Sequence, residues 1–153
     1  TDLTDLLFSE FALDPDAQAI TGHSMGGHGA LTLAAKTPGR FRSVSAFAPI
    51  CNPTDSDWGK KQFDAYLGGV GPGKAHDATC LIQGGALDAP LLIDTGTDDQ
   101  FGDLLKTEAL AQAVTERRME ATIRMQKGYD HSYFFVSTFM EDHIAFHAEA
   151  LWA

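Results

Sequence analysis

A single serine inside a glycine-rich turn has the surroundings that point most directly to chemistry. The segment from Gly22 to Gly26, GHSMG, has the pattern G-x-S-x-G and lies between a short apolar run, residues 17–21, and a helix-like stretch, residues 27–36. In such a strand-to-helix turn the serine hydroxyl is held away from the backbone at the start of a helix. The turn strains the serine and brings its neighbours too close for a β-carbon. The pattern therefore predicts that Ser24 is a nucleophile and that Gly22 and Gly26 are both sterically required.

A serine hydroxyl is a weak nucleophile at neutral pH, so it needs a base, and the base needs an acid that fixes its tautomer. The strand-like segment 90–94 leads into a run of aspartates, and the strand-like segment 121–125 leads into a glycine-containing loop with His131. Sheet enzymes bind ligands at the carboxyl ends of their strands, where both loops begin. The chain order serine, acid, histidine matches that of enzymes with this turn. Spacing alone leaves the acid open among Asp94, Asp98 and Asp99.

Longer blocks of the sequence resemble one enzyme family. They are GHSMGGHGAL (22–31), SVSAFAPICNP (43–53), WGKK (58–61), YLG (66–68), DDQF (98–101) and GYDHSY (128–133). Over nearly its whole length the chain is similar to S-formylglutathione hydrolase, also called esterase D. The resemblance implies an α/β-hydrolase fold in which Ser24 is the nucleophile, Asp99 the acid and His131 the base.

The same resemblance implies a reaction, the hydrolysis of S-formylglutathione to formate and glutathione in formaldehyde detoxification, with side activity on small carboxylesters. The Met25 N–H, at a helix N-terminus, would donate to the oxyanion. Trp58 would either pack in the core or form a wall of the acyl pocket. No metal or organic cofactor is expected. Two alternatives stay open: another small-acyl esterase or acyltransferase of the same fold, and a truncated chain without catalytic activity.

The family's proteins are nearly twice as long as this chain, and the difference lies on the N-terminal side. We therefore expect residues 1–153 to form the C-terminal portion of a single α/β-hydrolase domain, the half that carries the nucleophile turn. The first strands of the sheet and the loop with the second oxyanion donor would be absent. Such a chain is expected to expose one edge of its sheet and to be nearly inactive alone.

The amino-acid composition limits the classes of molecule that the chain is expected to bind. The formal net charge is −10 and the calculated pI is about 4.8, so a nucleic acid or an anionic membrane would be repelled. No apolar run approaches the length of a membrane span. Cys51 and Cys80 are expected to be free thiols in a reducing cytosol. The expected partner is a small glutathione thioester in the cytoplasm, and a homodimer is compatible with the sequence.

Apolar spacing predicts strands that alternate with helices, and hence a parallel sheet with right-handed crossovers. The long connection 49–89, rich in glycine, is expected to form short helices and loops. The expected helices are residues 3–11, 27–36, 103–118 and 132–151, and the expected strands are residues 17–21, 43–48, 91–94 and 122–125.

Other titratable residues have competing interpretations. His143 and His147 have the spacing of two zinc ligands on a helix, but the glutamate of the metalloprotease motif is absent, so solvated helix residues are expected. His23 is expected to pack beside the turn and His28 to lie on a helix face, although either could compete as the base. Asp130 could compete with Asp99 as the partner of the neighbouring histidine, but adjacent loop residues rarely face each other.

Overall fold

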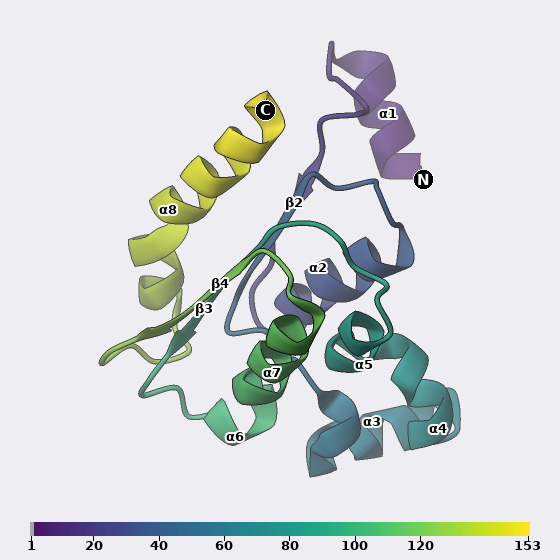
Figure 1. Ribbon diagram of the computed structural model, residues 1–153, viewed down its shortest axis with the longest axis vertical. Coiled ribbons are helices and arrows are strands. Elements are labelled where there is room, and N and C mark those ends of the chain that lie inside the picture. Colours follow the sequence, from purple (N-terminus) through teal and green to yellow (C-terminus); the bar gives the residue numbers. More distant parts are fainter. Residues whose placement is uncertain (1) are drawn as a thin grey trace.

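One parallel sheet organises the molecule. The structure, a computed structural model, describes residues 2–153, and its four strands lie in the order β1-β2-β3-β4 (Figure 1). All three neighbouring pairs are parallel. The strands are β1 (Ala19–Ile20), β2 (Ser43–Phe47), β3 (Leu91–Gly96) and β4 (Ala121–Gln126).

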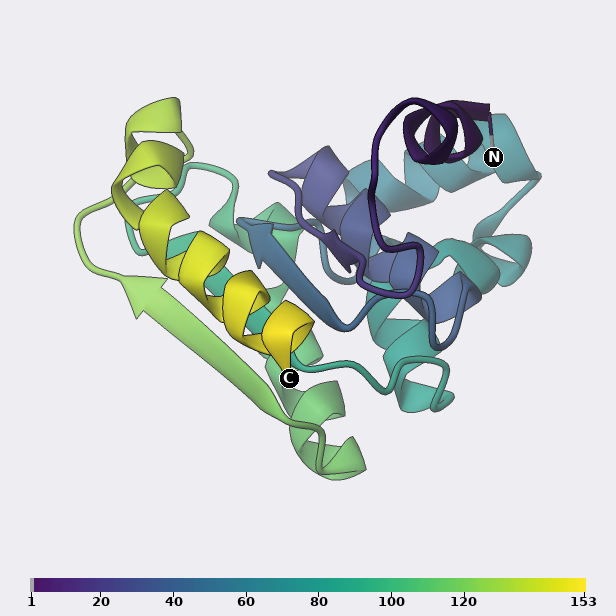
Figure 2. The same ribbon diagram turned by 90° about the horizontal axis from the view of Figure 1, so that it is seen from above.

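Helices cover both faces of this sheet. Helices α2, α5 and α7 pack on one face, and α8 lies across the other, as the view from above shows (Figure 2). The long connection after β2 folds into short helices and turns, as expected. The helices are α1 (Asp2–Glu10), α2 (Met25–Lys36), α3 (Asp57–Leu67), α4 (Val70–Gly73), α5 (Ala78–Gln83), α6 (Gly102–Leu105), α7 (Thr107–Arg117) and α8 (Tyr133–Trp152), with 3₁₀ turns at Pro53–Asp55 and Lys74–His76.

The two faces of the central strands differ in chemistry. Every residue of β2 and β3 is buried, as expected for parallel strands covered on both sides. Side chains alternate along a strand, so Val44 and Ile93 join the apolar core under α2, α5 and α7. Ser45 and Asp94 instead contact α8 through hydrogen bonds to His143. The interface between the sheet and α8 is therefore partly polar.

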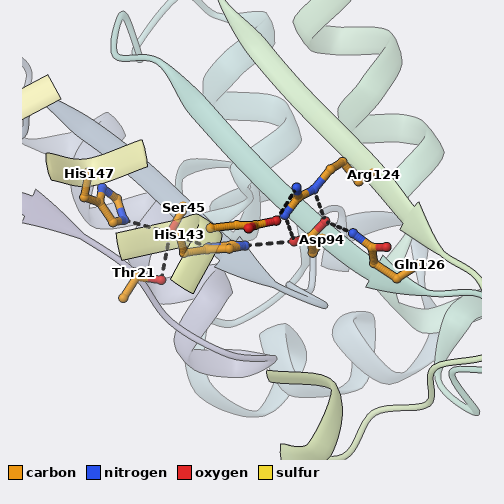
Figure 3. Close-up of polar contacts among 8 residues, drawn as sticks. Thr21, Ser45, Asp94, Arg124, Gln126, His143 and His147 are labelled. Atoms are coloured by element: carbon orange, nitrogen blue, oxygen red, sulfur yellow. Dashed lines mark hydrogen bonds and ion pairs between the residues drawn. The ribbon is translucent and has the colours of Figure 1, made fainter. Parts of the chain in front are cut away.

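Asp94 is the centre of this polar interface (Figure 3). Its side chain is fully buried, and it accepts two hydrogen bonds from the Arg124 guanidinium at 2.7 and 2.5 Å and one from Gln126 at 2.9 Å. His143 Nε2 lies 3.0 Å from Asp94 Oδ2. Burial alone would raise the pKa of the Asp94 carboxyl, but hydrogen bonds from His143, Arg124 and Gln126 outweigh it and lower the pKa to about 2. The carboxylate is therefore charged inside the protein.

Ser45 extends the interface to the rest of α8. Its hydroxyl lies 2.8 Å from His143 Nδ1, 2.8 Å from His147 Nε2 and 2.8 Å from the Thr21 hydroxyl (Figure 3). The expectation that both histidines are solvated is wrong, because residues four apart share a helix face and this face lies on the sheet. His143 is 1% exposed and His147 is half-buried, and burial lowers the pKa of His147.

Two other expectations need correction. The helix expected at residues 103–118 is interrupted at Lys106, whose φ is 56°, and this break separates α6 from α7. The third strand does not end at Asp94 but continues to Gly96. A β-carbon on Gly96 would lie 2.1 Å from the Tyr129 carbonyl oxygen, so this strand end requires glycine. The other predicted elements are present with boundaries shifted by a few residues.

The charge on Asp94 predicts a specific loss of stability in acid. Its pKa is about 2 in the folded chain, against an ordinary value of 3.8, so the unfolded state binds this proton more readily. The contribution is fully present above pH 4 and is lost as the pH falls from about 4 to about 2, by roughly 2 kcal/mol. In Asp94→Asn this acid-dependent part is absent. At pH 7 the variant should lose about 3 kcal/mol of unfolding free energy, because the half-buried Arg124 guanidinium loses its carboxylate partner.

Chemical denaturation of both proteins across this pH range measures the difference. Asp88→Asn is the matched control, because Asp88 is exposed, and its unfolding curve should follow that of the parent. An Asp94→Asn variant with the parent's acid dependence would contradict this account of the buried carboxylate.

Candidate active site

Ser24 lies in a strained turn between β1 and α2. Its backbone angles are φ 57° and ψ −116°, in the region that side-chain-bearing residues rarely adopt. Backbone bonds to the end of β2 hold the turn: the Ser24 N–H donates to the Phe47 carbonyl at 2.9 Å, and the Phe47 N–H donates to the Gly22 carbonyl at 2.9 Å. The strain is therefore supported by the neighbouring strand, and the geometry is that of a nucleophile elbow.

The steric requirement for glycine falls on Gly22 and Gly27. A β-carbon on Gly22 would lie 2.2 Å from the Gly26 carbonyl oxygen. On Gly27 it would meet the Pro49 side chain at 3.0 Å and the Ala46 side chain at 3.2 Å. On Gly26 it would meet nothing within 4 Å among the described residues, so the expectation that Gly26 is sterically required is wrong. The reason is that Gly26 faces outward on the first turn of α2, whereas Gly27 faces β2.

Met25 is the first residue of α2 and follows Ser24 directly. The first N–H groups of a helix have no partner within the helix, and the helix dipole places partial positive charge there. The Met25 N–H is thus placed where it could donate to the carbonyl oxygen of an acyl group that is attacked by Ser24, which is the role expected for it.

His131 and Asp99 form a hydrogen-bonded pair. The distance from His131 Nδ1 to Asp99 Oδ2 is 2.6 Å, and the two side chains are 11% and 0% exposed. Because a carboxylate only accepts, Nδ1 carries the proton and Nε2 is left to act as a base in the neutral ring. The other oxygen of Asp99 accepts the Phe101 N–H at 2.8 Å, which fixes the carboxylate plane.

The other aspartates have different partners. Asp98 accepts the Thr97 hydroxyl at 3.0 Å, and Asp130 accepts the Ser132 N–H at 3.0 Å. Asp94 belongs to the buried interface under α8. Of the acids that the sequence left open, the structure therefore brings Asp99 to His131.

The loops that carry this pair are bonded to each other. The Asp98 N–H donates to the Tyr129 carbonyl at 3.0 Å, and the Gly128 N–H donates to the Thr97 hydroxyl at 2.9 Å. Gly96 lies so close to Tyr129 that no β-carbon fits between them. The loop after β3 and the loop after β4 consequently form one packed unit that holds Asp99 and His131.

One ring of the serine turn contacts this unit. The His131 ring lies 4.6 Å from the ring of His23, the residue before Ser24, and 5.0 Å from the Phe101 ring, which meets it edge-on at 79°. His28, the other histidine near the turn, instead has its Nδ1 2.8 Å from the Ile50 carbonyl. His131 is therefore the described histidine that combines an acid partner with a place beside the elbow.

A mostly apolar cavity of about 320 Å³ opens at Ser24. Phe101, Leu104 and Leu105 line it from the segment after Asp99, and Met25, Ile50 and Trp58 complete its wall. Trp58 also lines a neighbouring cavity of about 270 Å³, so the structure places it on a cavity wall rather than in the core. The expected helix at residues 103–118 gave no sign that Leu104 and Leu105 line a cavity, because the break at Lys106 leaves no signal in apolar spacing.

A second serine, histidine and aspartate lie in hydrogen-bonded order elsewhere in the chain. Ser45 Oγ is 2.8 Å from His143 Nδ1, and His143 Nε2 is 3.0 Å from Asp94 Oδ2. These residues are 0%, 1% and 0% exposed, in the same order. No substrate reaches them, so this set is structural, whereas Ser24 opens on a cavity.

Residues 2–153 show neither a metal-binding cluster nor a disulfide. No three or more histidine, cysteine or acidic side chains gather there in a way that could hold a metal ion. Cys51 and Cys80 are free thiols, and burial raises the pKa of both. The Cys51 thiol donates to the Pro49 carbonyl at 3.3 Å. None of the helices in this part of the chain is long and apolar enough to cross a membrane.

Comparison with known proteins shows the family of this chain. A family model described as "Putative esterase" matches residues 1–146. The S-formylglutathione hydrolase of Paracoccus denitrificans is 60% identical over 151 residues, which are 98% of this chain and 54% of that protein. The S-formylglutathione hydrolase of Mus musculus is 51% identical over 157 residues, with 98% of this chain and 55% of that protein covered.

Similarity to solved structures shows which fold the chain has. The S-formylglutathione hydrolase from Agrobacterium tumefaciens has a TM-score of 0.92 and 43% identity, over 98% of this chain and 55% of that one. A Staphylococcus aureus S-formylglutathione hydrolase, at 20% identity and a TM-score of 0.76 over 95% of this chain and 61% of that one, shares the fold. The fold is that of the α/β-hydrolases. The chain spans about half the length of the curated relatives it matches.

The elbow predicts opposite outcomes for two neighbouring glycines. Gly22→Ala should destabilise the chain by about 2 kcal/mol or more, because its β-carbon would overlap backbone that cannot move without opening the turn. Gly26→Ala should stay within about 0.5 kcal/mol of the parent. Thermal unfolding of both variants measures the difference. Equal losses in the two variants would show that the turn is not packed as described.

Proposed function

Because the chain belongs to the esterase family whose model it matches over residues 1–146, we propose that it carries the catalytic residues of a serine thioesterase. The proposed reaction is the hydrolysis of S-formylglutathione to formate and glutathione. The observation that carries the proposal is the accessible Ser24 turn, which lies beside a hydrogen-bonded His131–Asp99 pair and opens on an apolar cavity.

The first half of the reaction transfers the acyl group to Ser24. Its Oγ forms a bond to the thioester carbonyl carbon while the hydroxyl proton passes to Nε2 of His131. The resulting imidazolium is stabilised by Asp99, and the oxyanion accepts a hydrogen bond from the Met25 N–H. The carbon–sulfur bond then breaks, and the thiolate leaves with the proton from His131. Glutathione and an acyl-serine result.

The second half returns the enzyme to its starting state. A water molecule takes the place of the thiol, gives its proton to His131 and forms a bond to the acyl carbon. The carbon–oxygen bond to Ser24 breaks, and the serine recovers its proton from His131. Formate is the product, and none of these steps needs a metal or an organic cofactor.

The cavity suits a small acyl group. Its wall of Met25, Ile50, Trp58 and leucines offers apolar contact to the acyl group. The relatives named S-formylglutathione hydrolase support glutathione as the thiol half of the substrate. We place the reaction in formaldehyde catabolism in the cytoplasm. The homodimer stays a prediction.

Part of the machinery is proposed to lie outside these residues. An oxyanion site of this kind uses two N–H donors, and the second comes from a loop after an earlier strand. The chain covers only 54% of the Paracoccus protein, so the remainder of a relative has room for that loop. We therefore propose that full activity belongs to the longer arrangement, and functional assays should use the whole gene product that carries this sequence.

The proposal predicts that Ser24→Ala abolishes turnover. The variant should lose a factor of about 10⁴ or more in kcat on S-formylglutathione, because members of a triad act as a unit. It should also lose covalent labelling by a fluorophosphonate, which the parent should show. Both are measured on purified protein. Labelling that persists in the variant would remove Ser24 from this role.

The choice of thioester over ester is tested in the same assay. Comparison of S-formylglutathione with an aryl ester of the same acyl group should give the larger kcat/KM for the thioester. A parent protein that is labelled and cleaves only the aryl ester would be another small-acyl esterase of this fold. A parent that is neither labelled nor active would be a chain without catalytic function.

Asp99 and Asp98 form a matched pair for a second prediction. Asp99→Asn should lower kcat by about 10⁴, by analogy with the serine protease case, because the amide favours the wrong tautomer of His131. Asp98→Asn should cost far less, since Asp98 bonds to Thr97. Steady-state kinetics of the two variants decide between them. A larger loss in Asp98→Asn would reassign the acid.

A further inference from the structure

His23, the residue before the nucleophile, makes a contact that the proposed mechanism does not use. Its ring lies 4.6 Å from that of His131, with 39° between the planes. The ring of Phe101 also contacts the His131 ring, edge-on, with 5.0 Å between the ring centroids. The catalytic imidazole thus contacts two rings, while its Nδ1 is fixed 2.6 Å from Asp99.

The charge state of His23 follows from its surroundings. The groups that face it are His131, Asp99 and the ring of Tyr133 at 5.8 Å. Burial is the main cause that lowers the pKa of His23, and the charge of His131 lowers it further, while the charge of Asp99 and a hydrogen bond with the backbone of His131 oppose them with smaller effects. Its Nε2 is buried and has no hydrogen-bond partner among residues 2–153. His23 is therefore neutral while His131 cycles between its two states.

A neutral aromatic face beside a cation attracts it, and the attraction grows where water is excluded. His131 becomes a cation when it takes the proton of Ser24, so the ring of His23 interacts more strongly with the charged state than with the resting one. Interactions that strengthen toward the transition state raise kcat rather than lower KM. A polar atom left buried without a partner is a cost that an apolar residue of the same shape would avoid.

We propose that His23 is a positioning residue that holds the His131 ring by a tilted ring contact and stabilises its imidazolium form. The proposal rests on the assignment of His131 as the base. It predicts that what matters at position 23 is a ring face, not a hydrogen-bonding side chain. An aromatic replacement should therefore keep the function, and an aliphatic or amide replacement of similar bulk should lose it.

Three variants of the whole gene product test this: His23→Phe, His23→Leu and His23→Gln. His23→Leu and His23→Gln should lower kcat on S-formylglutathione about tenfold with KM unchanged, and should move the acid limb of the pH profile of kcat/KM to lower pH. His23→Phe should keep both close to those of the parent. His76→Leu is the matched control and should match the parent, because His76 is exposed and contacts Lys36 at the C-terminal end of α2, whereas Ser24 precedes the N-terminal end.

NMR titration of the histidine ring protons gives a readout that does not need turnover. His131 should take up its proton at lower pH in His23→Leu and His23→Gln than in the parent or in His23→Phe. A parent without turnover would refute the proposed function, whereas this titration would still decide the role of His23. Parent-like kinetics and titration in His23→Leu or His23→Gln, or an equal loss in His23→Phe, would overturn the proposal. If one variant does not fold, the other carries the same expectation.

Discussion

A buried negative charge, that of Asp94, is the interaction on which the arrangement of this chain depends. A carboxylate without water is tolerated only when its oxygens are fully bonded, and here the bonds come from Arg124 and Gln126 on β4 and from His143 on α8. The charge thereby ties β3 to its neighbouring strand and to the helix that covers them. Asp99 follows β3, and His131 lies between β4 and α8, so the elements tied by Asp94 are those that carry the proposed acid and base.

The nucleophile also depends on contacts from elements other than its own. Ser24 holds a backbone conformation that costs free energy, and the cost is met by bonds to Phe47 and by the close approach that Gly22 and Gly27 allow. The elbow therefore depends on β2, while the acid and base depend on β3, β4 and α8. The proposed site forms where these two supports meet, at the rings of His23 and His131.

Much of this could be predicted from the sequence, and the failures have physical causes. The G-x-S-x-G pattern and the chain order identified Ser24 and His131, because turn chemistry and strand ends are local signals. Choosing Asp99 needed the family resemblance, since Asp94 lies in one strand, Asp98 and Asp99 follow it, and only folding decides which of them reaches the histidine. His143 was misjudged because a polar residue on a helix face gives no sign of the buried partner it meets. Lys106 was missed because a left-handed residue leaves apolar spacing intact.

The contact between Gly96 and Tyr129 has a mechanical consequence. Since the loops of Asp99 and His131 are bonded to each other and leave no room for a β-carbon on Gly96, we expect them to move together as one rigid body. Flexing of the sheet would carry the pair toward or away from the serine without stretching its 2.6 Å bond. The distance that can vary most easily in the site is then the one between this rigid body and the elbow. Because β2 holds the elbow, substitutions in β2 could change the distance from Ser24 to His131 without changing the Asp99–His131 pair.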